Sequence, residues 1–123
     1  MFSGSELTTD TVEKIEGASQ AGTLFLSAIS AWEIGMLLSK NRIALSMELE
    51  DWIERAFNHE GVQTLAPNPT MLARSSFLPG RLHGDPADRI IIATARAEGL
   101  TILTRDRLIL DYAAEGYVAA LPC

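Results

Sequence analysis

Cysteine, lysine and long hydrophobic runs are scarce in this sequence. The only cysteine, Cys123, is the last residue, which excludes an intrachain disulfide and any metal site built from several cysteines. The longest apolar runs, residues 24–29 and 90–95, are far shorter than the roughly 20 residues of a transmembrane helix. Residues 1–7 contain neither a basic leader nor an apolar signal core, so we expect a cytoplasmic protein.

Basic charge is scarce as well. The 123 residues include 10 Lys and Arg against 16 Asp and Glu, for a net charge of -6. This balance excludes nucleic-acid binding through overall basic charge, so any phosphate contact must be local or go through a metal ion. Apolar residues at 47% and charged residues at 21% are typical of a globular protein, and the length predicts a single domain over residues 1–123.

Helices and strands are predicted to alternate along the chain. Apolar residues at helical spacing, with capping residues and stop glycines, predict helices at residues 10–21, 31–39, 46–60, 69–75, 88–98 and 107–113. Short apolar runs predict strands at residues 24–26, 62–65, 101–104 and 117–121. Two prolines and two glycines predict a loop at residues 77–87. The alternation predicts an α/β fold, a three-layer α/β/α sandwich with a mainly parallel sheet.

Three carboxylates lie near the ends of predicted strands or at the starts of the following helices: Glu33, Asp88 and Asp106. The carboxyl ends of parallel strands meet at one crevice, so we expect these groups to converge if their strands are neighbours. Mg²⁺ and Mn²⁺ prefer carboxylate oxygens, and such a cation offsets the repulsion between clustered acids. A bound ion can also activate water and stabilise charge on a phosphodiester.

Each acid also has a purely structural interpretation. Glu33 follows Ser30 by three residues, which is the spacing of a capping box. Asp85 and Asp88 lie at a helix N-terminus, where the helix dipole favours an acid. Asp106 can serve as a turn residue or N-cap. Taken singly, the residues leave both interpretations open.

In combination, the motifs that contain these acids resemble a known family. Residues 27–34 (SAISAWEI), 83–93 (HGDPADRIIIA) and 103–106 (LTRD) occur in the order and spacing of PIN-domain ribonuclease toxins of the VapC type. The resemblance covers the chain from roughly residue 8 onward. It implies an endoribonuclease that uses Mg²⁺ or Mn²⁺ to activate water. Such an enzyme is the toxin of a type II toxin–antitoxin pair and cleaves structured RNA, for example transfer RNA.

The resemblance also implies roles for individual residues. Catalysis and metal binding are assigned to Glu33, Asp88 and Asp106, and the residues expected to support the site from beside it are Thr104, Asp85 and Ser30. The implied partners are RNA, a cognate antitoxin and a second copy of the chain. Candidates for the partner surface are Trp32, Met36 and Leu37, together with the helix that carries Trp52 and Phe57, for which ordinary core packing is the alternative.

Arginines can hold phosphate through two hydrogen bonds, so a local patch could bind RNA on an acidic protein. Arg89 and Arg105 are the expected RNA contacts, and ordinary solvated surface is the alternative for each. His83 is interpreted as a loop residue rather than a general base.

The chain departs from the family at its N-terminus. Family members begin with a strand that carries an Asp, in a pattern such as Leu-Asp-Thr-His. Asp10 and Thr11 only echo this pattern, because polar residues precede them and a helical pattern follows, so we predict Asp10 to be a helix N-cap. We therefore expect an N-terminally truncated fold in which the first central strand is missing. Such a chain should bind metal weakly and cleave RNA poorly.

Two other classes of function compete with the nuclease. A catalytically inactive PIN-like module that binds a partner or RNA is favoured by the missing Asp strand. Phosphoryl-transfer domains of the receiver or dehalogenase type share the α/β layout but use a lysine late in the chain, whereas the only lysines here are Lys14 and Lys40. A glycine-rich phosphate loop is also missing from the sequence.

Overall fold

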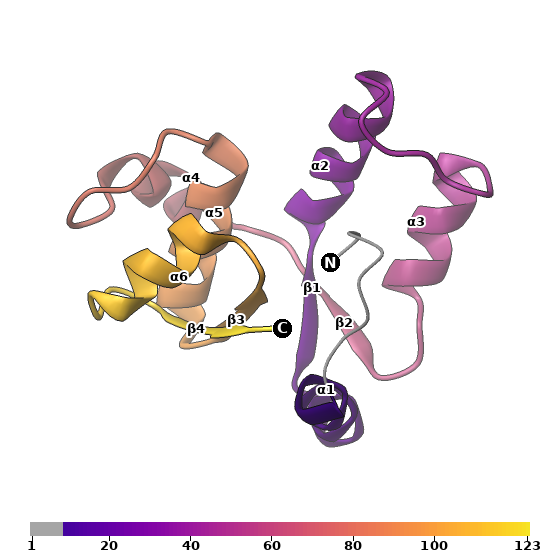
Figure 1. Cartoon of the computed structure of the whole chain (residues 1–123), viewed down its shortest axis with the longest axis horizontal. Coiled ribbons are helices and arrows are strands. Elements are labelled where there is room, and N and C mark those ends of the chain that lie inside the picture. The colour runs from indigo at the N-terminus through magenta and orange to yellow at the C-terminus, as the bar shows by residue number, and fades with distance from the viewer. Residues whose placement is uncertain (1–8) are drawn as a thin grey trace. The chain divides into compact units, whose positions relative to one another are not determined.

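The computed structural model describes residues 9–123, and two compact parts can be described in it (Figure 1). We call Val12–Ala66 the N-terminal unit and Pro67–Cys123 the C-terminal unit. The described residues begin with α1 (Thr9–Ala21), β1 (Leu24–Ser27), α2 (Ala28–Ser39), α3 (Leu49–Phe57) and β2 (Val62–Leu65). The C-terminal unit contains α4 (Pro69–Arg74), the 3₁₀ turn η1 (Ser75–Phe77), α5 (Pro86–Glu98), β3 (Thr101–Thr104), α6 (Arg107–Ala114) and β4 (Ala119–Pro122).

In the N-terminal unit, β1 pairs in parallel with β2, from Leu24 opposite Val62 to Ser27 opposite Leu65. Figure 1 shows β1 running directly into α2. Ser27 makes this abrupt change possible, because its hydroxyl accepts a hydrogen bond from the backbone N–H of Ile29 at 3.2 Å and so caps α2. Within the described part of this unit, Ile34 of α2 is the buried apolar residue, at 2% exposure.

A glycine brings β2 close to α1. Gly61 precedes β2 with a φ of +83°, a conformation that side chains disfavour. A Cβ at this position would lie 1.8 Å from Oγ of Ser19 in α1. The turn into β2 therefore requires glycine for two reasons, its backbone conformation and the space beside it.

In the C-terminal unit, β3 pairs in parallel with β4, from Thr101 opposite Ala119 to Thr104 opposite Pro122. The core lies between α5 and α6, where Ile92 and Tyr112 are almost completely buried. Ile109 is buried with them, and the partly buried residues that pack on this cluster are Leu78, Leu82, Ile102, Tyr117, Val118 and Ala120. The hydroxyl of Tyr112 donates a hydrogen bond to the carbonyl of Pro79 at 2.5 Å, which ties the loop before α5 to the core.

The predicted α/β class and the parallel pairing of strands are confirmed. In residues 9–123 the four strands form two separate pairs, β1 with β2 and β3 with β4, instead of one continuous sheet. Within the same residues α1, and no strand, precedes β1. None of the helices in this part of the chain has both the length and the apolar content needed to cross a bilayer.

Several predicted boundaries were wrong by two or three residues. α2 begins at Ala28 instead of residue 31, because Ser27 and not Ser30 is the N-cap. α5 begins at Pro86 instead of residue 88, because Asp85 caps it and proline suits the first helical position. α3 begins at Leu49 instead of residue 46, and β4 begins at Ala119 instead of residue 117. Asp10 lies inside the first turn of α1, so its prediction as the N-cap is wrong.

Candidate metal centre

Asp88 is placed by the capped start of α5. The side chain of Asp85 accepts a hydrogen bond from the backbone N–H of Asp88 at 3.1 Å, and Pro86 occupies the first turn. An N-cap carboxylate satisfies one of the N–H groups that a helix start leaves without a partner. Asp88 therefore projects from the first turn of a helix whose origin is set by the sequence Gly-Asp-Pro.

Asp106 is placed by the turn between β3 and α6. Its Oδ1 accepts hydrogen bonds from the backbone N–H groups of Leu108 at 2.8 Å and Ile109 at 3.3 Å, which makes it the N-cap of α6. Thr104, the last residue of β3, accepts a hydrogen bond from the N–H of Asp106 at 3.0 Å through Oγ1. Both capping bonds use Oδ1, so Oδ2 is the oxygen that can bind a cation.

The structure brings Asp88 and Asp106 together with His83. One ligand atom from each of these three residues lies within 4.8 Å of the others. His83 belongs to the loop before α5, and its Nε2 is 2.7 Å from Oδ2 of Asp88. The carboxylates of Asp88 and Asp106 fit Mn²⁺ or Mg²⁺, since their oxygens are hard ligands, and the imidazole of His83 lies beside them. This group is the candidate metal centre, and its residues all belong to the C-terminal unit.

The electrostatics of Asp88 also favour a cation. Burial raises the pKa of Asp88 above its ordinary value of 3.8, and the carboxylates of Asp85 and Asp106 raise it further. The hydrogen bond from His83 acts in the opposite direction and lowers this pKa. The side chain of Asp88 is 15% exposed, so little water screens these interactions. A divalent cation beside Asp88 would offset the repulsion between its charge and those of the two other acids.

The two arginines predicted to bind RNA make contacts inside the C-terminal unit. The guanidinium of Arg89 donates hydrogen bonds to the carbonyl oxygens of Ser75 at 2.8 Å, Leu82 at 3.2 Å and His83 at 3.3 Å. Nε of Arg105 donates to the carbonyl oxygen of Cys123 at 3.1 Å. Arg89 thus holds the loop that carries His83, and RNA binding by either arginine stays a prediction.

Glu33 is the sixth residue of α2, in the N-terminal unit. The capping-box interpretation of Glu33 is wrong, because α2 is capped by Ser27 and Ser30 lies inside the helix. The metal-binding role of Glu33 and the supporting role of Ser30 stay predictions.

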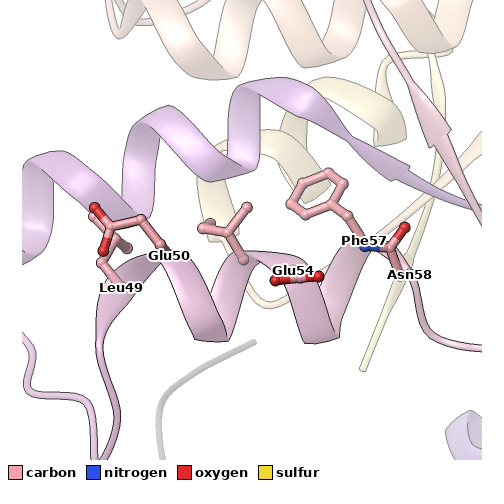
Figure 2. Close-up of a pocket in the computed structure, with 6 residues that line it drawn as sticks. Leu49, Glu50, Glu54, Phe57 and Asn58 are labelled. Carbon is pink, nitrogen blue, oxygen red and sulfur yellow. The ribbon is translucent and has the colours of Figure 1, made fainter.

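A second surface feature lies on α3. Leu49, Ile53 and Phe57 line an open hollow along this helix, with Glu50, Glu54 and Asn58 beside them. Figure 2 shows Leu49 and Phe57 at opposite ends of the hollow and the carboxylate of Glu54 between them. No residue of the candidate metal centre lines this hollow. The hollow is lined by apolar side chains of α3 together with two glutamates, Glu50 and Glu54.

His83 is the site residue that the sequence analysis did not select. Its proximity to Asp88 follows from the sharp course of residues 83–88, where Asp85 and Pro86 start α5 directly after the loop. The signal was present in the sequence as a histidine five residues before the acid. The sequence alone does not show that the two side chains meet, because this depends on the turn between His83 and Asp88, which brings the imidazole back to the first turn of α5.

Comparison with known proteins agrees with the fold. The sequence profile of the PIN domain matches residues 1–115. The chain belongs to the PIN-domain family and, within it, to the VapC type. It is 35% identical over 97 residues to a protein of Mycobacterium tuberculosis named Ribonuclease VapC22. This alignment covers 79% of the chain and 73% of that relative.

Proposed function

We propose that this chain is a metal-dependent endoribonuclease and the toxin of a type II toxin–antitoxin pair. One observation carries the proposal: Asp88 and Asp106, which come from different elements, converge with His83 to within 4.8 Å. Membership of the PIN-domain family and the similarity to a protein named as a ribonuclease support RNA as the substrate class. Structured RNA such as transfer RNA is the proposed target, and the cytoplasm is the proposed compartment. A single PIN-like domain over residues 1–123 is the proposed organisation.

In this proposal Asp88 and Asp106 hold Mg²⁺ or Mn²⁺, and the metal-binding role of Glu33 stays a prediction from the sequence. A bound divalent ion would supply the positive charge that activates a water molecule and stabilises the reacting phosphodiester. Asp85 and Thr104 place the two acids through hydrogen bonds to backbone N–H groups. Arg105 is the proposed contact to an RNA phosphate, since an arginine can bind such a group through two hydrogen bonds.

The test is cleavage of a structured RNA with Mn²⁺ or Mg²⁺ by the chain and by Asp88→Asn and Asp106→Asn. Asparagine keeps an acceptor for the hydrogen bond from His83 and for the cap of α6, so both variants should fold while losing a negative charge. We expect cleavage to fall to the background of the metal-free reaction in each. Asp111→Asn, an exposed acid in α6, is the matched control and should cleave normally. Cleavage that persists in both site variants would refute the proposal.

We keep the expectation of weak metal binding. The cluster found in the described residues offers two carboxylates and one imidazole, whereas Mg²⁺ in proteins is bound mainly by oxygen ligands. The same observation supports a second candidate function, an inactive PIN-like module that binds RNA or a partner. Tight RNA binding without metal-dependent cleavage would favour this second function over the nuclease.

The proposed partners are a cognate antitoxin and a second copy of the chain. On α2, Trp32 is 46% exposed and Met36 is 38% exposed, and their spacing of four residues places both side chains on one face of the helix. We place the antitoxin on this face, together with Leu37 and the stripe of α3 that includes Trp52 and Phe57. Met36→Glu and Trp52→Ala should weaken co-purification with the antitoxin, while Leu72→Glu on α4 should not. Sedimentation of the chain alone tests the proposed homodimer.

A further inference from the structure

His83 is the least expected member of the candidate metal centre, and its hydrogen bonding defines what it can do. Its Nε2 lies 2.7 Å from Oδ2 of Asp88, and the two side chains are 20% and 15% exposed. The other ring nitrogen, Nδ1, is buried, with no hydrogen-bond partner among the described residues. The two nitrogens therefore have very different surroundings.

These surroundings select one tautomer. A buried N–H without an acceptor has lost its hydrogen bond to water and gained no other, which costs free energy. Such groups are therefore rare in folded proteins. A proton on Nδ1 would create this situation, whereas a proton on Nε2 points at the carboxylate of Asp88. Nε2–H therefore donates to Oδ2, and Nδ1 carries the lone pair. A nitrogen that carries a hydrogen has no lone pair to give to a metal ion, so in this arrangement Nε2 is not a ligand.

The backbone around His83 is held in place by Arg89. Nη1 of Arg89 donates to the carbonyl oxygens of Leu82 and His83, and Nε donates to that of Ser75. Arg89 directly follows Asp88 on α5. The imidazole and the carboxylate it contacts are thus anchored to the same turn of one helix, which fixes their separation.

We propose that His83 is a positioning residue that orients Asp88 for metal binding. Its Nε2–H holds Oδ2 of Asp88, so that Oδ1 is the oxygen presented to the cation, together with Oδ2 of Asp106. A hydrogen-bonded partner of this kind restricts the rotation of a ligating carboxylate, and its loss typically weakens metal binding about 10- to 100-fold. This inference rests on the proposed metal-dependent function, and it names a residue that acts through Asp88 and not on the substrate.

The experiment compares His83→Gln with His83→Asn in the full chain. The glutamine amide nitrogen can reach the place of Nε2 and donate to Asp88, whereas the shorter asparagine amide cannot. Mn²⁺ affinity is measured by calorimetry and RNA cleavage in parallel. We expect Asn to weaken Mn²⁺ binding by about 10-fold or more and Gln to retain most of the affinity, because the hydrogen-bonded partner of a ligating carboxylate is typically worth about 10- to 100-fold. His59, an exposed histidine of the N-terminal unit, gives the matched control His59→Asn, which should bind Mn²⁺ normally.

The outcomes separate this inference from the function on which it rests. Equal losses in the Gln and Asn variants would overturn the positioning role. Tighter binding of Zn²⁺ than of Mn²⁺ that is lost in the Gln variant would overturn it in favour of direct coordination by His83. Nitrogen NMR of the imidazole rings gives a readout without metal, and a proton on Nδ1 of His83 would also overturn the proposal. If the NMR shows Nε2–H but Mn²⁺ binding is unaffected by Asp88→Asn, the metal function fails and the hydrogen bond stands as a structural contact only.

Discussion

The carboxylate of Asp85 accepts a hydrogen bond from the backbone N–H of Asp88 at 3.1 Å, so the N-cap of α5 and a candidate metal ligand are directly joined. Asp85 also raises the pKa of Asp88 through its charge. One residue therefore both starts the helix that carries Asp88 and adds to the negative potential at the candidate metal centre.

Replacing Asp85 separates these two effects. Asp85→Ala removes the cap and should lower the free energy of unfolding by about 1 kcal/mol. Asp85→Asn keeps a capping oxygen and should cost much less, while it lowers the pKa of Asp88. Urea unfolding of the two variants without metal checks the difference. Equal losses of stability in both variants would show that the charge, and not the cap, is what stabilises α5.

The raised pKa of Asp88 predicts how stability depends on pH without metal. The folded chain favours the protonated carboxyl, because burial and the charges of Asp85 and Asp106 disfavour the anion. The protonated carboxyl of Asp88 therefore stabilises the folded chain below the ordinary pKa of 3.8. This stabilisation is lost as the pH rises through the higher pKa that Asp88 has in the folded chain. Asp88→Asn should therefore melt a few degrees above the unaltered chain at pH 7. The two melting curves should converge as the pH falls toward 3.8. A lower melting temperature for the variant at pH 7 would contradict this prediction.

Thr104 offers a test of how Asp106 is held. Its Oγ1 accepts the hydrogen bond from the N–H of Asp106, and valine has the same shape without the acceptor. Thr104→Val should lower the stability by about 1 kcal/mol because it leaves that N–H without its partner. It should also weaken Mn²⁺ binding, since Asp106 is then less well fixed. Thr104→Ser retains the hydroxyl and should behave like the unaltered chain. Normal binding of Mn²⁺ by the valine variant would refute the supporting role of Thr104.

Gly61 and Gly17 form a matched pair in the N-terminal unit. Alanine at Gly61 would place a Cβ 1.8 Å from Oγ of Ser19 at a φ of +83°. We expect Gly61→Ala to cost about 1–3 kcal/mol, the usual range for backbone strain of this kind. Gly17 is an exposed residue of α1 with no atom within 4 Å of the added Cβ, so alanine there should stabilise the helix by about 0.5–1 kcal/mol. Thermal unfolding monitored by circular dichroism compares the two, and a stabilising Gly61→Ala would contradict the close approach of β2 to α1.

The sequence predicted the α/β class well because its signals are local. Alternating apolar runs and capping residues were enough to predict the α-helices and strands described in residues 9–123, whereas the 3₁₀ turn η1 was not predicted. The errors lie at boundaries where two residues compete to start a helix. Ser27 and Ser30 can both cap α2, and the run of β1 into α2 selects Ser27. Asp85 and Asp88 compete in the same way for α5, and Pro86 favours the earlier start.

The sequence by itself determined the acids of the candidate site, because Asp88 and Asp106 are tied to local features, the first turn of α5 and the N-cap of α6. It also determined the family, since three spaced motifs carry the resemblance. Only the tertiary structure decided the role of the residues around these acids. His83 meets Asp88 through the course of a loop, and Arg89 donates to the carbonyls of that loop. Both arrangements depend on packing between segments that no periodicity in the sequence encodes, whereas a helix cap depends only on its immediate neighbours.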